Sequence, residues 1–507
     1  MKYQNPIISG FYPDPSICRV GEDFYLVTSS FEYFPGVPIF HSTDLVNWKQ
    51  LGHCLTTTKQ LPLIETPSSC GIYAPTIRYH EGVFYVVTTN VLDGGNFFVT
   101  ATDPAGPWSD PIWFKDSYGI DPSFFFDEDG TCYLTGTGGH GEEPGIYQVE
   151  IDVKTGAYLS DRKCLTVGTG GAFPEGPHLY RIGEYYYLLM SEGGTEYGHM
   201  LTVFRSKTPY GPFEGYEKNP ILTHRSKDHP IQATGHADFV QRSDGSWWAV
   251  FLAIRPIGYP RKYHLGRETF LAPVSWTEDG WPVVGNDGMV DEVIESEWLI
   301  NEQHKEWKER DNFDQATLNL KWIYRRNPIE EHYSLNTKEG YLSLTGSSVT
   351  LNDTAAHTFI GRRQEHFDCK VSTSLRFEPK ESEEAGLTVF ANEHFHYEIG
   401  LRSVNGKTEA FFRKTVGSLT LIEKRLDYEE DRIELCITAD SQWYHFEIVS
   451  PSGEVTELGK GECGLLATEV AGGFTGNVFG LYATANGKKT ANQARFNWFD
   501  YKRFGKV

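Results

Sequence analysis

Apolar positions in the first three hundred residues recur in short runs with the period of a β-strand rather than of a helix. Five segments share one order: an acidic or small residue, usually a proline, an apolar run, a glycine turn and an aromatic-rich run. They read DPSICRVGEDFYLVTSS, APTIRYHEGVFYVVTTN, DPSFFFDEDGTCYLTGTG, EGPHLYRIGEYYYLLMSEGG and GHADFVQRSDGSWWAVFLAIR. Each segment predicts a β-hairpin, and the turns fall at Gly21, Gly82, Gly130, Gly183 and Gly245.

The five hairpins are spaced like the blades of a propeller. Successive copies begin roughly 47 to 60 residues apart, close to the length of one four-stranded blade. Further strand-like runs, such as VPIFHSTDLVNWKQ and NFFVTATDPAGPW, lie between the hairpins. We therefore predict an all-β chain in which residues 1–300 form a five-bladed β-propeller.

A second domain is predicted after the last blade. Residues 301–312 are strongly charged and are interpreted as a connector. Residues 313–507 contain many short alternating runs without blade spacing, such as CKVSTSLRFEP and WYHFEIVSPSG. This pattern is typical of a β-sandwich. The length of 507 residues also exceeds what one ordinary core supports.

The charge balance argues against two classes of partner. The net charge is −22 and no basic block is present, so nucleic acid and membrane surfaces are not expected partners. Aromatic residues make up 14% of the chain. This content fits a site that stacks sugar rings, although strand propensity alone explains most of it.

The N-terminal residues and the cysteines indicate in which cellular compartment the protein is expected. MKYQNPIISGFYPDP has no apolar core of the kind that a secretory signal needs, and no run reaches membrane-spanning length. The eight cysteines are scattered without a CxxC pair, which favours reduced thiols over a disulfide framework. A cytoplasmic location is therefore expected.

The predicted propeller gathers ionisable residues at its axis. The first strand of each blade lines the central channel, so the leading positions of the five copies converge. These positions are Asp14, Ala74 with Tyr73 beside it, Asp121, Glu175 and His236. Neighbouring carboxyl groups raise the pKa of at least one of them, which separates an acid from a base. Hydrolysis of a glycosidic bond needs such a pair.

Each of these residues has a structural alternative. An aspartate before a proline is more often a turn residue than a catalyst, and Glu175 could bond backbone amides of its glycine-rich loop. His236 fits a channel-lining role as well as a functional one. Acids at matched blade entrances favour chemistry, because a turn role gives no reason for that placement.

The motifs together resemble glycoside hydrolase family 43, in its branch of β-xylosidases and α-L-arabinofuranosidases. The resemblance covers nearly the whole chain and rests on NPIISGFYPDPSICRVGEDFYLVTSSFEYFPGVPIFHSTDLVNW, GIYAPTIRYHEGVFY, GIDPSFFFDEDG, PEGPHLY, SEGGTEYGH, TGHADFV and LGRETFLAPV. It implies a five-bladed propeller carrying an inverting glycosidase, followed by a β-sandwich of the concanavalin-like jelly-roll type. By the same resemblance, Asp14 is the general base, Glu175 the general acid and Asp121 the residue that tunes the pKa of the acid. Inversion requires the base and acid carboxyl groups to lie about 6.5 to 9.5 Å apart.

Several substrate contacts are also implied by the resemblance. Phe31 matches a position that packs against the nonreducing sugar, Arg267 one that bonds sugar hydroxyls, and Thr195 lies near the loop of the acid. The alternatives are a core aromatic for Phe31 and, for Arg267, a salt bridge to a nearby acid such as Glu268. His236 is counted with the substrate-binding residues.

Two further positions concern the shape of the pocket. Tyr73 departs from the tryptophan that often precedes Ala-Pro in this branch, which leaves the preferred sugar open. The GGFTGNVFG stretch resembles a loop that reaches over the pocket with an aromatic residue, here Phe474. If the loop closes one end of the channel, the pocket trims one sugar from a chain end.

A required cofactor is not expected. HExxH and EF-hand patterns are absent, and the glycine-rich loops lack the residues of a phosphate loop. Calcium is considered at two places: near His236, as in some members of the family, or at Asp311, Asp314 and Asp500, at the two chain ends of the sandwich. For these aspartates, turn and strand-end roles are the favoured alternative.

The function predicted is that of an exo-acting, inverting glycoside hydrolase that releases xylose from the nonreducing end of β-1,4-xylo-oligosaccharides, with α-L-arabinofuranosidase side activity. The alternatives are α-L-arabinofuranosidase as the main activity, an endo-acting arabinanase, and a noncatalytic carbohydrate-binding protein. The expected partners are small carbohydrates, and a homo-oligomer is left open.

Overall fold

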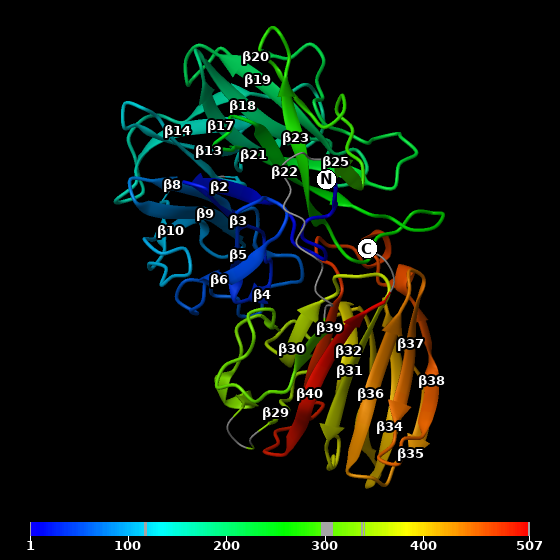
Figure 1. Cartoon of the computed structure of the whole chain (residues 1–507). Helices are drawn as coiled ribbons and strands as arrows, with labels where there is room; N and C mark the ends of the chain where they lie inside the picture. The colour runs from blue at the N-terminus through cyan, green and yellow to red at the C-terminus, as the bar shows by residue number, and fades with distance from the viewer. Residues whose placement is uncertain (1, 116–118, 296–307, 336–337, 339, 505–507) are drawn as a thin grey trace.

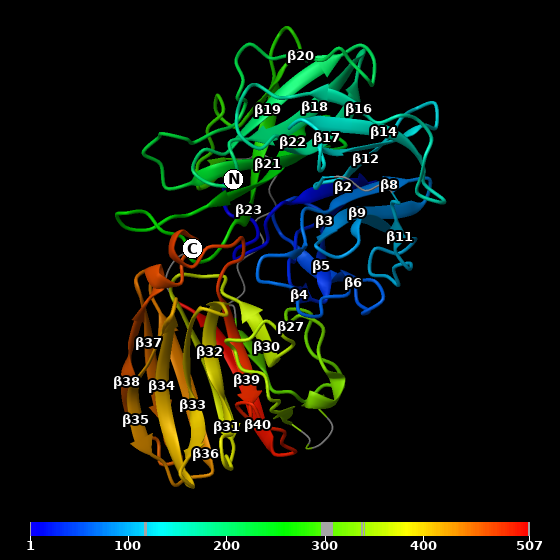
Figure 2. The same ribbon diagram turned by 180° about the vertical axis from the view of Figure 1, so that it is seen from behind.

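The computed structural model describes residues 2–115, 119–295, 308–335, 338 and 340–504. In these residues the helical segments are two single 3-10 turns, Glu330–His332 and Cys463–Leu465, and the four-residue helix α1 (Thr468–Ala471). All other regular structure is strand. The strands form two bodies, a propeller in the upper part of Figure 1 and a sandwich in the lower part, and Figure 2 shows both from behind. The all-β prediction is confirmed.

Five antiparallel sheets of four or five strands form the propeller within the described residues, one for each predicted hairpin. The first blade contains β2 (Ser16–Val20), β3 (Asp23–Val27), β5 (Gly36–Ser42) and β6 (Lys49–Leu55). The second contains β7 (Gly71–Ile72), β8 (Thr76–His80), β9 (Val83–Val91), β10 (Gly95–Ala101) and β11 (Ile112–Trp113). The third contains β12 (Ser123–Phe126), β13 (Cys132–Thr137), β14 (Ile146–Asp152), β15 (Ala157–Tyr158) and β16 (Lys163–Thr166). The fourth contains β17 (Glu175–Ile182), β18 (Tyr185–Glu192), β19 (Met200–Ser206) and β20 (Glu214–Gly215). The fifth contains β21 (Gln232–Gln241), β22 (Trp247–Ile254), β23 (Glu268–Trp276) and β24 (Pro282–Val284).

The glycine turns set the register of the hairpins. Val20 pairs with Asp23, so only two residues connect β2 to β3, and Gly21 adopts a φ of +64° that a side chain would disfavour. Ile182 pairs with Tyr185 in the same way across the turn between β17 and β18. Both turns therefore consist of two residues and fall at the predicted glycines, Gly21 and Gly183.

The N-terminal segment joins the last blade to the first. Strand β1 (Lys2–Gln4) pairs with β25 (Val293–Glu295). The Asn5 side chain donates to the Leu271 carbonyl and accepts from the Leu271 amide, both at 2.9 Å. Leu271 lies in β23, so the N-terminal segment contacts the fifth blade before the chain enters the first blade. These hydrogen bonds connect the first and last blades of the propeller.

The sandwich consists of two eight-stranded sheets, and its sequence pattern follows the strand period. In β32 (Glu384–Asn392), the side chains of Ala385, Leu387 and Val389 point into the core between the sheets. One sheet contains β26 (Lys308–Asp311), β28 (Tyr333–Ser334), β29 (Leu342–Thr345), β31 (Cys369–Arg376), β36 (Arg432–Ala439), β37 (Trp443–Val449), β38 (Val455–Glu462) and β40 (Gln493–Arg503). The other contains β4 (Tyr33–Phe34), β27 (Ile323–Arg325), β30 (Thr358–Arg363), β32 (Glu384–Asn392), β33 (Phe395–Val404), β34 (Lys407–Val416), β35 (Leu419–Asp427) and β39 (Val478–Thr484).

The boundary between the two bodies differs from the predicted connector at 301–312. Residues 301–307 of that connector lie outside the described residues. Residues 308–311 form β26, which pairs with β40 and so belongs to the sandwich. In addition, β4 from the propeller segment pairs with β27 at the edge of a sandwich sheet. The two bodies are therefore joined by a backbone ladder as well as by a covalent link.

The eight cysteines are free thiols, and five of the six most buried lie within strands. In the described parts of the chain, no helix has the length and apolar character needed to cross a membrane.

Candidate active site

Three carboxyl groups meet at the entrances of the inner strands. Asp14 and Asp121 each lie two residues before an inner strand, and Glu175 is the first residue of β17. Asp14 and Asp121 both have a φ of +56°, a left-handed conformation that is uncommon for residues other than glycine. Strain of this kind often occurs at functional sites. The side chains of the two aspartates are buried.

Asp14 is held in its ionised form. Ser29 Oγ donates to Oδ2 at 2.5 Å, and Arg267 Nη1 donates to Oδ1 at 2.8 Å. His236 Nδ1 lies 4.0 Å from Oδ1. Burial is the largest single influence and acts to raise the pKa of Asp14, but Arg267, His236 and the Ser29 hydrogen bond together outweigh it. The net result is a pKa below the ordinary value. The carboxylate can therefore accept a proton.

Glu175 is held in its protonated form. Burial raises its pKa well above the ordinary value, and the negative charges of Asp121 and Asp14 raise it further. Arg267 acts in the opposite direction but does not cancel these effects. A protonated carboxyl group beside an ionised one is the arrangement that supplies a general acid and a general base in one site.

Asp121 links the other two carboxyl groups. The Gly176 amide, adjacent to Glu175, donates to Asp121 Oδ2 at 3.0 Å. Burial raises the pKa of Asp121, His236 acts to lower it and Asp14 to raise it, and the net shift is upward. Asp121 thus fixes the backbone beside Glu175 and acts on the pKa of Glu175.

Arg267 connects the carboxylates to the aromatic wall. The same Nη1 that bonds Asp14 donates to Thr195 Oγ1 at 2.8 Å. Its guanidinium lies 5.7 Å from the ring centre of Phe31 and 5.5 Å from that of Phe474. Glu268 instead pairs with Arg255, at 2.7 and 2.8 Å. The alternative of an Arg267–Glu268 salt bridge is therefore wrong.

Three aromatic rings from distant parts of the chain form one wall of the site. The ring centres of Phe31 and Phe474 are 6.2 Å apart and stacked, and Tyr73 meets both edge-on at 5.7 and 5.9 Å. Phe31 is buried, whereas Phe474 keeps 37% of its surface exposed. Such a cluster offers apolar faces for the C–H surface of a sugar.

The Phe474 loop of the sandwich is attached to a propeller loop through Ser69. The Phe474 amide donates to Ser69 Oγ at 2.8 Å, and the Ser69 amide donates to Glu32 Oε2 at 2.9 Å. A Cβ atom on Gly473 would lie 2.4 Å from Ser69 Oγ, so the close approach depends on that glycine. Phe474 is therefore positioned by residues of both bodies.

Two buried histidines flank the carboxyl groups. The His236 ring packs against Gly176, where an added Cβ atom would lie 3.0 Å from the ring. His199 is fully buried, and its Nδ1 lies 3.9 Å from Glu175 Oε1. Burial is the main cause that lowers the pKa of His199 to about 3, and the neighbouring His236 and Arg267 act in the same direction, so the His199 ring is neutral.

A cavity of about 700 Å³ extends outward from Glu175. Phe173 and Thr195 of the propeller line one side, and Thr468 and Phe474 of the sandwich line another. The cavity therefore lies between the two bodies, with one carboxyl group of the site in its wall.

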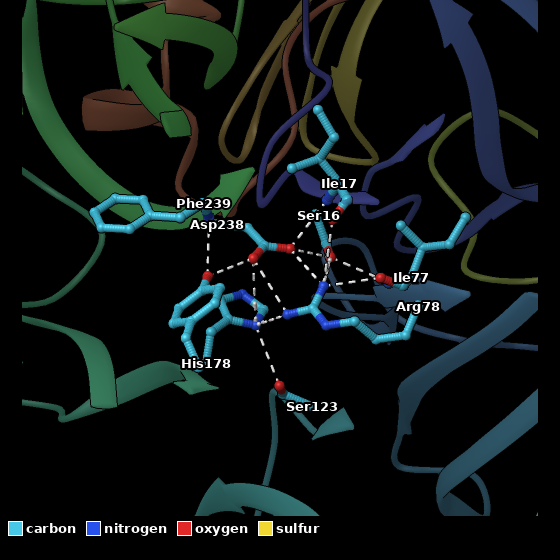
Figure 3. A network of polar contacts seen from close by, with 9 residues as sticks. Ser16, Ile17, Ile77, Arg78, Ser123, His178, Asp238 and Phe239 are labelled. Atoms are coloured by element: carbon cyan, nitrogen blue, oxygen red, sulfur yellow. Dashed lines mark hydrogen bonds and ion pairs between the residues drawn. The ribbon is translucent and has the colours of Figure 1, made fainter. Parts of the chain in front are cut away.

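A polar network further along the inner strands ties the five blades together (Figure 3). Arg78 pairs with Asp238 at 2.7 Å and contacts His178 Nδ1 at 2.9 Å. Asp238 also accepts from Ser16 at 2.6 Å, and His178 contacts Ser123 at 3.2 Å. These five residues lie in the inner strands of five different blades. The network therefore fixes the inner strands relative to one another, and with them the residues at which those strands begin.

The structure brings together nine of the predicted site residues: Asp14, Phe31, Tyr73, Asp121, Glu175, Thr195, His236, Arg267 and Phe474.

The three predicted calcium aspartates do not form a site. Asp311 accepts from the Phe313 amide at 2.9 Å and from Trp322 Nε1 at 2.8 Å, as a turn residue does. Asp500 pairs with Lys502, and Asp314 with the side chain of Gln315. In the described parts of the chain, no group of three or more His, Cys, Asp or Glu side chains could hold a metal ion, either here or near His236. Asp311 is the last residue of β26, whereas Asp500 lies within β40.

Four residues near the site were not predicted: Ser29, Glu32, Ser69 and His199. His199 ends the SEGGTEYGH motif, which is a signal that could have identified it. Ser29, Glu32 and Ser69 act through contacts between distant segments, and no local pattern marks them.

Two family models match the chain. The model for glycosyl hydrolases family 43 matches residues 3–282, and the model for the beta xylosidase C-terminal concanavalin A-like domain matches residues 310–502.

Similar proteins cover the chain from end to end. A non-reducing end alpha-L-arabinofuranosidase of Bacteroides ovatus is 46% identical over 99% of this chain and 94% of its own length. A xylosidase/arabinosidase of Butyrivibrio fibrisolvens is 39% identical over 98% of both chains. Among solved structures, a Bacteroides ovatus protein of a xyloglucan locus superposes with a TM-score of 0.95 at 45% identity, covering 99% of this chain and 100% of that one. A xylan beta-1,4-xylosidase of Bacillus halodurans gives 0.92 at 32% identity, again covering 99% and 100%.

Proposed function

The chain belongs to glycoside hydrolase family 43, and on this premise we propose that it is an exo-acting, inverting glycosidase that removes one terminal pentose at a time. The observation that carries the proposal is the difference between two carboxyl groups in one site. The pKa of Asp14 is lowered by Arg267 and Ser29 against the effect of burial, and the pKa of Glu175 is raised by burial and by neighbouring carboxylates.

This difference assigns the steps of the reaction. Glu175 gives its proton to the glycosidic oxygen as the bond between that oxygen and the anomeric carbon breaks. Asp14 accepts a proton from the water that attacks the anomeric carbon from the opposite face. The new C–O bond then has the inverted configuration. Asp121 keeps Glu175 protonated until transfer, and Arg267 remains available for sugar hydroxyls.

Exo action is supported by the sandwich. Phe474 lies against Phe31 and Tyr73, so a sugar placed at Asp14 meets an aromatic wall on one side. A wall of this kind suits a chain end better than the middle of a chain, which requires an open groove.

The proposed main substrate is a terminal α-L-arabinofuranosyl residue, because the relative at 46% identity carries that activity in its name. A terminal β-D-xylosyl residue is the second candidate, supported by the relative named as both xylosidase and arabinosidase. The two sugars have similar shapes around the scissile bond, so one pocket can hold either. Tyr73 is the residue in the wall with a hydroxyl group that could favour one of them.

The test of the proposed reaction uses nitrophenyl α-L-arabinofuranoside and nitrophenyl β-D-xyloside. The wild-type protein should hydrolyse at least one, and Asp14→Ala should remove nearly all of that turnover. Glu175→Ala should remove nearly all turnover of a disaccharide with the same terminal pentose, because a sugar leaving group needs the proton that Glu175 supplies. Proton NMR of the first product formed should show the inverted anomer. The exposed Glu184→Ala variant is the control and should retain full activity.

Two outcomes would contradict the proposal. Hydrolysis of neither glycoside, with sugar binding retained, would indicate a noncatalytic carbohydrate-binding protein. Substantial turnover of a nitrophenyl glycoside by Asp14→Ala, or of the disaccharide by Glu175→Ala, would overturn the roles assigned to these residues.

A further inference from the structure

The cavity beyond Glu175 lies on the leaving-group side of the reaction. Glu175 is in its wall, whereas Asp14, Phe31 and Tyr73 are not. The proton of Glu175 goes to the oxygen of the leaving group, so atoms beyond that oxygen extend away from Asp14. They therefore enter the cavity that begins at Glu175.

The volume of the cavity exceeds the needs of one sugar. At about 700 Å³ it lies in the upper half of the range of about 300 to 1,000 Å³ in which proteins bury drug-sized ligands. A single pentose is much smaller than such a ligand. The space beyond the scissile bond therefore fits a leaving group of two or more sugar residues.

Phe173 presents an apolar ring to this cavity. The ring is 70% exposed, two residues before Glu175, and its backbone has a φ of +51°. A Cβ atom on Gly194 would lie 3.3 Å from the ring, so the glycine gives the ring room to lie against its backbone. An exposed aromatic ring in a strained conformation gains nothing from the folded core, but it matches the C–H face of a sugar.

The opposite wall is held firmly by the sandwich. Glu469 in α1 accepts from Tyr197 Oη at 2.9 Å and from the Tyr263 amide at 3.0 Å. These bonds attach the Thr468–Ala471 helix to two propeller loops beside the cavity. The leaving group therefore enters a space with one wall from each body, and both walls are positioned before it binds.

We propose that this cavity binds at least two sugar residues of the leaving chain, and that Phe173 is the platform on which the first of them stacks. This inference rests on the proposed function and adds a specificity-determining residue, Phe173, that favours a leaving group of two or more sugars over a single sugar or an aryl group.

The experiment measures kcat/KM for substrates that differ only in the leaving group. The series consists of the glycosyl fluoride and glycosides with one, two and three leaving-side sugars, made with the pentose that the enzyme releases. For the wild type, kcat/KM should rise about fivefold from one leaving-side sugar to two, because the cavity also buries the second sugar. The stacking of the first sugar on Phe173 is present with both substrates and is measured by removing the ring. Phe173→Ala should lose about fivefold on the sugar leaving groups and stay within twofold on the fluoride.

Two control variants accompany the series. Phe173→Trp keeps an aromatic surface and should preserve the preference for sugar leaving groups. Tyr259→Ala removes an aromatic ring that is 97% exposed and does not line the cavity, and it should change no value in the series.

The outcomes separate this inference from the function on which it rests. Hydrolysis of the fluoride without any rise along the sugar series would overturn the inference and leave the proposed function intact. An equal loss on the fluoride and the oligosaccharides in Phe173→Ala would also overturn it, because the ring would then act on the terminal pentose or on the fold of the site rather than on a leaving-side sugar. Failure of the wild type to hydrolyse the fluoride would contradict the proposed function itself.

Discussion

Three carboxyl groups at similar blade entrances differ in protonation because their immediate neighbours differ. Asp14 has a hydroxyl and a guanidinium within hydrogen-bonding distance, and these stabilise its charge. Glu175 has no such cation on its oxygens in the described residues and is surrounded by other acids. Burial alone would raise the pKa of both. The pairing of Asp14 with Arg267 therefore decides which group is the base.

Replacing Asp121 with asparagine tests how the acid is tuned. The negative charge of Asp121 raises the pKa of Glu175, so Asp121→Asn should lower that pKa. A general acid works only below its pKa, so the alkaline limb of kcat/KM against pH should move to lower pH, and the rate at the optimum should fall. Asp127→Asn is the control, because Asp127 is also buried but lies in the β12–β13 turn, at the opposite end of β12 from Asp121. An alkaline limb that stays in place would refute the tuning role.

Sequence reasoning predicted the acids because the repeat placed them at matched positions, but it could not predict their partners. Arg267 illustrates the limit: its neighbour Glu268 was the nearest acid in sequence, yet the chain bonds Arg267 to Asp14, more than 250 residues earlier. Partners across such distances depend on how blades close, and no local pattern encodes this.

At the scale of elements, short loops rather than strands complete the site. The propeller segment 66–70 is held by the sandwich on one side, where Ser68 Oγ donates to Glu393 Oε2 at 2.7 Å and Arg325 Nη2 donates to Ser68 Oγ at 2.7 Å. On the other side, Ser69 accepts from the Phe474 amide. The hairpins were predictable from glycine turns and alternation, whereas this loop has no periodic pattern and was not predicted.

Removing the Ser69 hydroxyl should loosen the Phe474 loop. Ser69→Ala and Ser69→Gly both lose the acceptor, worth about 0.5–1.5 kcal/mol, so KM for the aryl glycoside should rise about two- to tenfold. On the proposed role of Phe474 as a wall that binds the sugar equally before and during the reaction, kcat should stay within twofold. The measurement is steady-state kinetics on both variants.

The two Ser69 variants also control for each other. Ser69 has a φ of +63°, which glycine adopts without strain and alanine does not. Equal rises in KM with different melting temperatures would identify the hydrogen bond as the cause. A rise in KM confined to Ser69→Ala would indicate backbone strain instead, and would contradict the positioning role.

At the scale of the whole molecule, one buried network spans the propeller. Asp238 is completely buried, and Arg78 is its cationic partner. The network includes side chains from all five blades, so its loss should affect the whole domain rather than one sheet (Figure 3). The sequence predicted the convergence of the inner strands, but not which side chains would pair there.

Arg78→Met should lower stability strongly. The substitution leaves the Asp238 carboxylate buried without its cation, which typically costs about 3–5 kcal/mol. The melting temperature should fall clearly, and Arg78→Met combined with Asp238→Asn should recover part of the loss, because no uncompensated charge is then buried. Lys207→Met, which removes an exposed ion pair with Glu184, should leave the melting temperature unchanged. A small effect of Arg78→Met would mean that the blades hold together without this network.

The ladder between β4 and β27 has a consequence for engineering the enzyme. Cutting the chain between the two family-model regions would leave the sandwich sheet with an unpaired outer edge and would leave β4 without a neighbour. The sandwich domain therefore cannot be exchanged between relatives as an independent unit. A chimaera that imports the sandwich of a relative would need to import the Tyr33–Phe34 segment of that relative as well.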